Sequence, residues 1–212
     1  MKAIGDCHLY GILDGNYVDR AQALDVVTKM LAGGIDALQL RAKNWTLEEI
    51  TAVGREIHPL TLKRGIPLII NDFPEVAMAI GAEGVHVGQD DLPVQEVRQL
   101  VGGDMLVGLS THSLEQVRTA ANQKLDYIGF GPLFSTPTKP DYPAIGTREI
   151  AQAHKEQAGL PIFCIGGIKL ENAASVIEAG AQRFVVVSGI LQAGDIEAYT
   201  RNLKALFENI VT

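Results

Sequence analysis

The 212-residue sequence has little positive charge. It contains 18 lysine and arginine residues against 25 acidic residues, which gives a formal net charge of −7. A general nucleic-acid or membrane-surface binder needs a basic face to meet phosphate groups, so this balance argues against both classes. Any anionic ligand must therefore be held by local positive groups.

Cysteines and long apolar runs are also scarce. Cys7 and Cys164 are the only two cysteines, and because they share no CxxC or metal-ligand spacing we interpret both as small buried hydrophobic residues. No uninterrupted apolar run of about 18 residues occurs, and the N-terminal segment MKAIGDCHLY lacks the apolar run of a signal peptide. The sequence therefore predicts a cytoplasmic protein without a membrane span.

The composition that remains is that of one globular domain. Hydrophobic residues make up 47% of the chain and charged residues 20%, and no linker, low-complexity tract or charge run divides it. We therefore predict a single domain over residues 1–212. The oligomeric state is not decided, and a homo-oligomer stays open.

Short apolar runs alternate with longer segments of helical spacing. Segments 17–31 and 47–62 are examples of predicted helices. Glycines 33, 34, 81 and 180 precede the second, fourth and eighth runs, where they are predicted left-handed helix C-caps. The eight predicted strands are HLYGIL, DALQL, PLII, GVHV, MLVGL, DYIGF, PIFCI and RFVVV.

The order of these elements indicates an α/β fold with parallel strands. Strands that are almost uniformly apolar are typical of a sheet covered on both sides. A doubly wound open sheet is the alternative. Eight βα units in so short a chain, with no GxGxxG turn after the first strand, favour a single (β/α)₈ TIM barrel instead.

Catalytic groups of TIM barrels follow the C-terminal ends of the strands. After the second strand, the alternate spacing of Gln39, Arg41 and Lys43 keeps three donors on one side of an extended chain. This is a candidate anion clamp, and a solvated basic strand end is the alternative.

Carboxylates follow the third and fourth strands. Asn71 and Asp72 end one strand and Asp90 and Asp91 follow the next, so one carboxylate from each can meet at the rim of the barrel. Each Asp could instead cap the helix that follows it. A phosphate attracted by the clamp would be repelled by these carboxylates unless Mg²⁺ lay between them. We therefore interpret Asp72 and Asp91 as Mg²⁺ ligands, and Asp90 as a supporting or capping residue.

Hydroxyl groups and one lysine follow the fifth and sixth strands. Ser110 is expected to face inward, and the long segment 131–146 carries Thr136, Thr138 and Lys139. Hydroxyl and ammonium groups suit diphosphate oxygens, and Lys139 is the candidate for stabilising a departing diphosphate. A solvated surface lysine is the alternative.

Glycines and small residues end the last two strands. Gly167 lies after the seventh strand, and Val187 and Ser188 after the eighth, where TIM barrels frequently bind phosphate. Two phosphate sites indicate a group transfer. The sequence shows no Ser/His/Asp set, no clear Cys nucleophile and no histidine obviously placed as a base, which leaves electrostatic assistance to a leaving group.

Seven motifs at strand ends resemble those of the thiamine phosphate synthase family: QLRAK, LIIND, GVHVGQDDLP, GLSTHS, GFGPLFSTPTK, IGGI and VVSGI. The resemblance covers nearly the whole chain. It implies a Mg²⁺-dependent transferase that joins a pyrimidine diphosphate to a thiazole phosphate, with the diphosphate departing first. The strand 1 end, residues 11–15, is less distinctive and leaves the contacts to the pyrimidine ring open.

The resemblance also implies roles for individual residues. It implies that Gln39, Arg41, Lys43, Asn71, Ser110 and Lys139 contact the pyrimidine diphosphate, that Asp72 and Asp91 bind Mg²⁺, and that Thr136, Thr138, Gly167, Val187 and Ser188 face the thiazole phosphate. A thiazole tautomerase, a regulatory ligand-binding barrel and a sugar-phosphate isomerase or lyase are the alternatives. The first would lack the diphosphate and metal groups, and the last should show a catalytic acid and base.

Overall fold

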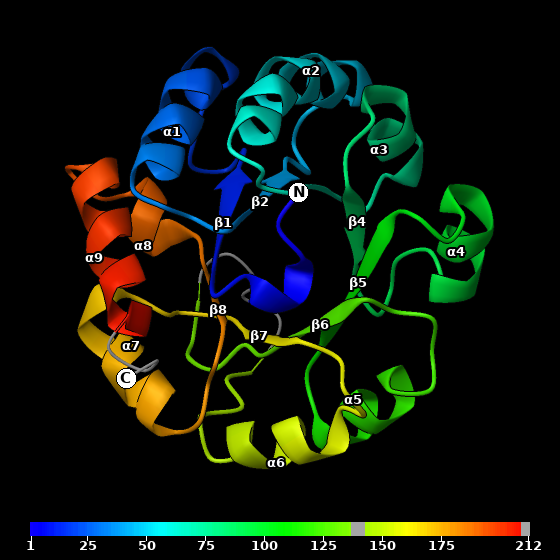
Figure 1. The fold of residues 1–212 in the computed structure, drawn as a ribbon, viewed down its shortest axis with the longest axis vertical. Coiled ribbons are helices and arrows are strands. Elements are labelled where there is room, and N and C mark those ends of the chain that lie inside the picture. The colour runs from blue at the N-terminus through cyan, green and yellow to red at the C-terminus, as the bar shows by residue number, and fades with distance from the viewer. Residues whose placement is uncertain (137–142, 209–212) are drawn as a thin grey trace.

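The computed structural model describes residues 1–136 and 143–208, and its eight parallel strands form a closed barrel in the order β1 to β8. β1 pairs with β8, which closes the ring. Figure 1 shows the helices surrounding the strands. The predicted TIM barrel is thus confirmed. The strands are β1 Leu9–Asp14, β2 Ala37–Arg41, β3 Leu68–Asn71, β4 Gly84–Val87, β5 Leu106–Thr111, β6 Tyr127–Phe130, β7 Ile162–Cys164 and β8 Phe184–Val186.

Helices alternate with the strands, except that η1 precedes β1 and both α8 and α9 follow β8. They are η1 Ile4–Asp6, α1 Arg20–Ala32, α2 Leu47–Lys63, α3 Pro74–Ile80, α4 Val94–Val101, α5 Leu114–Ala120, α6 Ile150–Glu156, α7 Leu170–Glu178, α8 Ser188–Leu191 and α9 Ile196–Glu208. α2 begins where predicted because a capping box at Thr46 starts it, and it ends one residue later than predicted. α1 begins three residues later than predicted, because the N–H groups of Tyr17 and Val18 form a turn on the carbonyl of Asp14.

Three of the four predicted C-cap glycines have left-handed backbone. The φ angles of Gly34, Gly81 and Gly180 are 93°, 71° and 105°, a region that glycine occupies at little cost. Gly33 was predicted in the same conformation, and this is wrong, because its φ is −73°. It lies so close to α9 that a Cβ atom would come within 2.5 Å of Thr200 Cβ.

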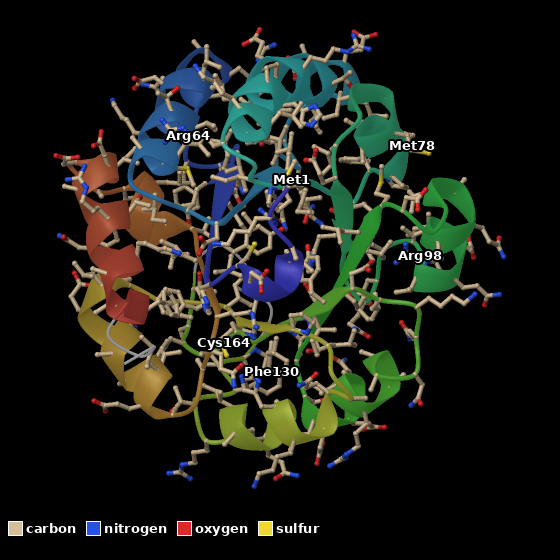
Figure 2. All side chains as sticks on the ribbon, in the orientation of Figure 1. Met1, Arg64, Met78, Arg98, Phe130 and Cys164 are labelled. Atoms are coloured by element: carbon tan, nitrogen blue, oxygen red, sulfur yellow. The ribbon has the colours of Figure 1, made fainter. Side chains whose placement is uncertain are left out.

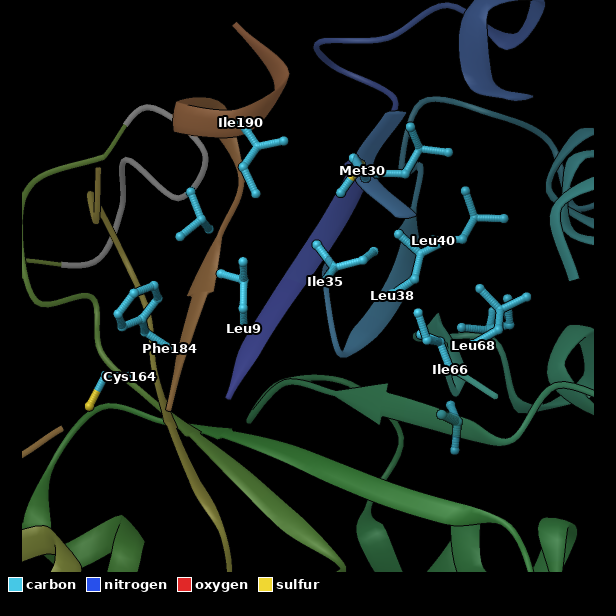
Figure 3. Close-up of a cluster of buried hydrophobic side chains, with 14 of the residues drawn as sticks. Leu9, Met30, Ile35, Leu38, Leu40, Ile66, Leu68, Cys164, Phe184 and Ile190 are labelled. Atoms are coloured by element: carbon cyan, nitrogen blue, oxygen red, sulfur yellow. The ribbon is translucent and has the colours of Figure 1, made fainter. Parts of the chain in front are cut away.

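Side chains of each strand alternate between two apolar layers. Leu9, Leu38 and Phe184 point outward and pack against the helices, as Figure 3 shows for part of this cluster. Tyr10 and Phe163 point inward, in a second cluster that η1 covers at the N-terminal ends of the strands. Figure 1 shows η1 lying across the centre of the barrel. The interior of the barrel is therefore closed at the N-terminal ends of the strands.

Polar groups lie mainly on the outside of the helical ring, where Figure 2 shows many side chains ending in nitrogen or oxygen. Within residues 1–136 and 143–208, no helix combines the length and apolar character needed to cross a membrane. Cys7 and Cys164 are buried free thiols, as predicted. Burial raises the pKa of each thiol to about 12, so neither is a reactive thiolate at neutral pH.

Candidate active site

A pocket opens at the C-terminal ends of the strands and encloses about 860 Å³, a volume that includes space open to solvent at its mouth. It lies where TIM barrels carry their active sites. Most predicted site residues within the described ranges line it: Gln39, Arg41, Asn71, Ser110, Thr136, Gly167, Val187 and Ser188. Thr138 and Lys139 lie outside the described residues. Their assigned roles stay predictions.

Arg41 is held in place by a carboxylate that the sequence did not point to. Asp14 is fully buried and pairs with the guanidinium of Arg41, a residue that is 8% exposed. The register of β1 and β2 sets these residues side by side. Arg41 Nε is buried and has no hydrogen-bond partner among the described residues, so one donor of this guanidinium is left unsatisfied. The predicted anion clamp is thus a preorganised, partly neutralised arginine.

Lys43, Asp72 and Asp91 form the acidic and basic part of the rim. Lys43 Nζ lies 2.8 Å from Asp72 Oδ2, and Asp91 lies within hydrogen-bonding reach of Asp72. Burial raises the pKa of the Asp72 carboxyl and Asp91 raises it further, while Lys43 opposes both. Two carboxylates that meet in this way would both be stabilised in their charged form by a divalent cation.

The alternative that these aspartates cap helices is wrong. The N-caps of α3 and α4 are Phe73 and Pro93, and neither makes a side-chain capping bond. Asp91 Oδ2 instead accepts a hydrogen bond from Gly88 N at 2.7 Å. Asp72 adopts left-handed backbone with a φ of 65°, which is uncommon outside glycine, and its N–H donates to the carbonyl of His86. Both carboxylates are thus directed by local geometry to the rim.

The floor of the pocket is aromatic, and it contains a histidine that the sequence reasoning missed. Tyr10, Tyr127 and Phe163 pack edge to face, with ring centroids 5.4 to 6.1 Å apart. His86 stacks on Tyr127, and its Nε2 lies 3.0 Å from Ser110 Oγ. A histidine inside the otherwise apolar strand GVHV was the available signal, because a single polar residue there has to face the interior or the helices.

The glycines after β7 have a packing role in addition to lining the pocket. Gly166 and Gly167 have φ angles of 99° and 65°, and a Cβ atom on Gly167 would lie 2.7 Å from Phe134 Cβ. The N–H of Phe134 donates to the carbonyl of Gly166. The loops after β6 and β7 therefore fit together only with glycine here. Phosphate binding by this backbone stays a prediction.

Together, the closed barrel and the pocket at its mouth define a TIM-barrel enzyme whose site combines carboxylates and cations at the rim with an aromatic floor. The family model described as Thiamine monophosphate synthase matches residues 9–190. The chain therefore belongs to the thiamine monophosphate synthase family. The predicted family, and with it a transferase, is confirmed.

Relatives and a solved structure agree with this assignment. The chain is 42% identical over 199 residues to the "Thiamine-phosphate synthase" of Roseiflexus sp. (strain RS-1), covering 93% of this chain and 84% of that protein. It is 40% identical to the protein of the same name from Shouchella clausii, covering 94% and 96%. The solved thiamine phosphate pyrophosphorylase from Pyrococcus furiosus has a TM-score of 0.88 and 28% identity, covering 97% of this chain and 98% of that one.

Proposed function

We propose that this protein is a thiamine phosphate synthase that joins hydroxymethylpyrimidine diphosphate to thiazole phosphate with the help of Mg²⁺ and releases diphosphate. The observation that carries the proposal is the meeting of Asp72 and Asp91 beside Lys43, at the rim of an aromatic pocket that also contains Arg41. The names of the relatives support the same reaction.

Asp72 and Asp91 would hold the Mg²⁺. Within the described ranges, no group of three or more His, Cys, Asp or Glu side chains is arranged to bind a metal. Two carboxylates are enough for Mg²⁺, which commonly takes its other ligands from substrate phosphate oxygens and water. When bound, the ion would neutralise charge on the departing diphosphate.

The reaction needs one bond to break and one to form. The bond between the pyrimidine methylene carbon and the diphosphate oxygen breaks, and its electron pair leaves with the diphosphate. The lone pair of the thiazole nitrogen then forms the new bond to the methylene carbon. No base is required, so the work of the protein is to stabilise the leaving group, for which Arg41, Lys43, Ser110 and Lys139 are the candidates.

The floor of the pocket suits the pyrimidine. Tyr10, Tyr127 and Phe163 present aromatic surfaces against which a flat ring can pack. The thiazole phosphate is expected on the side of Thr136, Thr138, Gly167, Val187 and Ser188.

The alternatives fit the site less well. A thiazole tautomerase would not need the paired carboxylates beside Lys43, and a regulatory barrel would not need a leaving-group site at all. An isomerase of sugar phosphates needs a side chain free to move protons on the substrate. His86 instead has both ring nitrogens bonded within the protein, to Tyr127 and to Ser110.

The proposal is tested by incubating the purified protein with Mg²⁺, hydroxymethylpyrimidine diphosphate and thiazole phosphate. We expect thiamine phosphate and diphosphate in equal amounts, and loss of product when a chelator removes the Mg²⁺. Absence of product across Mg²⁺ concentrations and pH would favour the regulatory barrel.

The metal assignment has its own test. Asp91→Asn keeps the side-chain shape but removes one ligand charge, so we expect it to raise the Mg²⁺ concentration for half-maximal rate about tenfold or more. Asp104→Asn, at an exposed aspartate in the turn after α4, is the control. An unchanged Mg²⁺ dependence in Asp91→Asn would remove Asp91 from the site.

The leaving-group role of Lys139 is tested in a single turnover. Lys139→Ala should slow the departure of diphosphate, because the positive charge of the lysine, which would stabilise the leaving group, is lost. An unaltered single-turnover rate would refute that role. The cytoplasmic location and the open homo-oligomer also stay predictions.

A further inference from the structure

A line of hydrogen bonds crosses the floor of the pocket and ends at Ser110. Gln39 Nε2 donates to Tyr10 Oη at 2.9 Å, and Tyr10 Oη lies 3.2 Å from Tyr127 Oη. Tyr127 Oη lies 3.1 Å from His86 Nδ1, and His86 Nε2 lies 3.0 Å from Ser110 Oγ. The line thus joins residues of five strands, from Gln39 on β2 through β1, β6 and β4 to Ser110 on β5, by way of the floor and not around the rim.

Packing holds the members of this line in position. Phe163 lies edge to face against both tyrosine rings, and His86 stacks on Tyr127. Gly108 leaves the room for that stack, because a Cβ atom there would lie 2.2 Å from Tyr127 Cζ and 2.6 Å from His86 Nδ1. The donors and acceptors therefore have little freedom to choose other partners.

Counting hydrogens gives the line a direction. Tyr10 accepts from the Gln39 amide, so its own hydrogen is available for Tyr127. Tyr127 can then donate to His86 Nδ1, and a neutral His86 carries its hydrogen on Nε2 and donates to Ser110. Every bond in the line is made, and the Ser110 hydroxyl keeps its own hydrogen for another acceptor.

With Nε2 of the Gln39 amide facing Tyr10, as in this structure, the opposite direction leaves a buried hydrogen without an acceptor. If His86 carried its hydrogen on Nδ1, Tyr127 would accept it and donate to Tyr10, which already accepts from Gln39. The Tyr10 hydrogen, on a residue only 1% exposed, would then have no acceptor among the described residues. An unsatisfied buried hydroxyl disfavours that arrangement by about tenfold or more.

We propose that Gln39 sets the direction of this line, and that Tyr10, Tyr127 and His86 are positioning residues that hold Ser110 as a hydrogen-bond donor facing the pocket. A hydroxyl that donates stabilises an anionic oxygen, whereas a hydroxyl that has given its hydrogen to His86 presents lone pairs that repel it. This inference rests on the proposed function, because it assigns the donor to the leaving diphosphate.

The test reverses the line with a substitution of equal shape. In Gln39→Glu the carboxyl can only accept once it is ionised, which its infrared carboxylate band checks at the working pH. Tyr10 must then donate to it, Tyr127 to Tyr10 and His86 Nδ1 to Tyr127. Imidazole ¹⁵N spectra distinguish the two tautomers of His86, recorded about two pH units above the ordinary histidine pKa of about 6.5. We expect the hydrogen on Nε2 in the wild type and on Nδ1 in Gln39→Glu. A hydrogen that stays on Nε2 overturns the proposal.

Tyr127→Phe is the matched control, because it cuts the line without changing charge or ring shape. In the Gln39→Glu/Tyr127→Phe double variant the hydrogen of His86 should stay on Nε2. If it still moves to Nδ1, the effect travels through space and the line is not its cause. Should Gln39→Glu fail to fold, the wild type decides alone. A wild-type hydrogen on Nε2 of His86 supports the proposal, and one on Nδ1 overturns it.

The consequence for the ligand is measured with inorganic diphosphate and Mg²⁺ by calorimetry. Gln39→Glu and the double variant carry the same charge and differ only in whether the line is intact. We expect the double variant to bind diphosphate about tenfold more tightly, because its Ser110 is again free to donate. Equal affinities would show that Ser110 is not set as a donor for this anion. Neither measurement needs turnover, so failure of the synthase assay is distinguishable from failure here.

Discussion

Asp14 is expected to be among the most sensitive positions for stability in this protein, although it is at the edge of the active site. It is fully buried and forms an ion pair with Arg41, which is 8% exposed. Its Oδ1 also accepts a hydrogen bond from Asn16 N at 2.8 Å. Asp14→Asn keeps the shape and one acceptor but leaves the buried guanidinium without its counter-charge.

The expected cost follows from that burial. Removing one partner of a buried ion pair typically costs about 3 to 5 kcal/mol, because the remaining charge stays out of water. Asparagine retains a carbonyl oxygen, so we expect the lower end, about 3 kcal/mol. Whole domains are stable by only about 5 to 15 kcal/mol. At about 2 to 4 °C per kcal/mol for a chain of this size, the melting temperature should fall by about 6 to 12 °C.

The assay is urea unfolding of both proteins followed by circular dichroism, with calorimetry for the melting temperature. Asp25→Asn is the matched control, because Asp25 forms an exposed ion pair with Lys29 and its side chain is 65% exposed. Such surface pairs contribute about 0 to 1 kcal/mol. If Asp14→Asn costs no more than Asp25→Asn, then water entering through the pocket solvates Arg41 and the reasoning is refuted.

Three further outcomes are expected. Gly108→Ala should destabilise the protein by about 1 to 3 kcal/mol, because its methyl group would lie 2.2 Å from the buried Tyr127 ring. Urea unfolding measures this cost. A free energy of unfolding within about 0.5 kcal/mol of the wild type, the scatter of neutral surface substitutions, would show that the ring moves. Thr46→Ala should cost about 1 kcal/mol, since it removes the capping box of α2, and the same measurement checks it. Burial raises the pKa of Asp36, but hydrogen bonds from two backbone N–H groups and two lysines outweigh it, so the net pKa is below its ordinary value. A lowered pKa gives stability that is present above the unfolded pKa of about 4 and is lost as pH falls through the folded value. The wild type should therefore lose more stability than Asp36→Asn on acidification below about pH 4, and parallel pH curves would contradict this.

Much of the architecture could be predicted from local sequence. The eight strands and the helices α1 and α2 could be predicted because a parallel barrel imposes the same burial on every βα unit, so apolar runs and helical spacing recur along the chain. Site residues at strand ends could also be predicted, because the C-terminal ends of all strands meet at one rim. Gln39, Arg41 and Asn71 were found in this way, and all three line the pocket.

Side-chain contacts between different strands could not be predicted from the sequence. Asp14 faces Arg41 only because β1 and β2 pair in one register, and a shift of one residue would turn each side chain to the other layer. His86 was missed because a four-residue strand does not reveal which of its faces points inward. What the sequence by itself determined is the order of elements and the polar residues that end them. Only closure of the barrel decided which side chains meet, because strand tilt and register, not local preference, bring them within bonding distance.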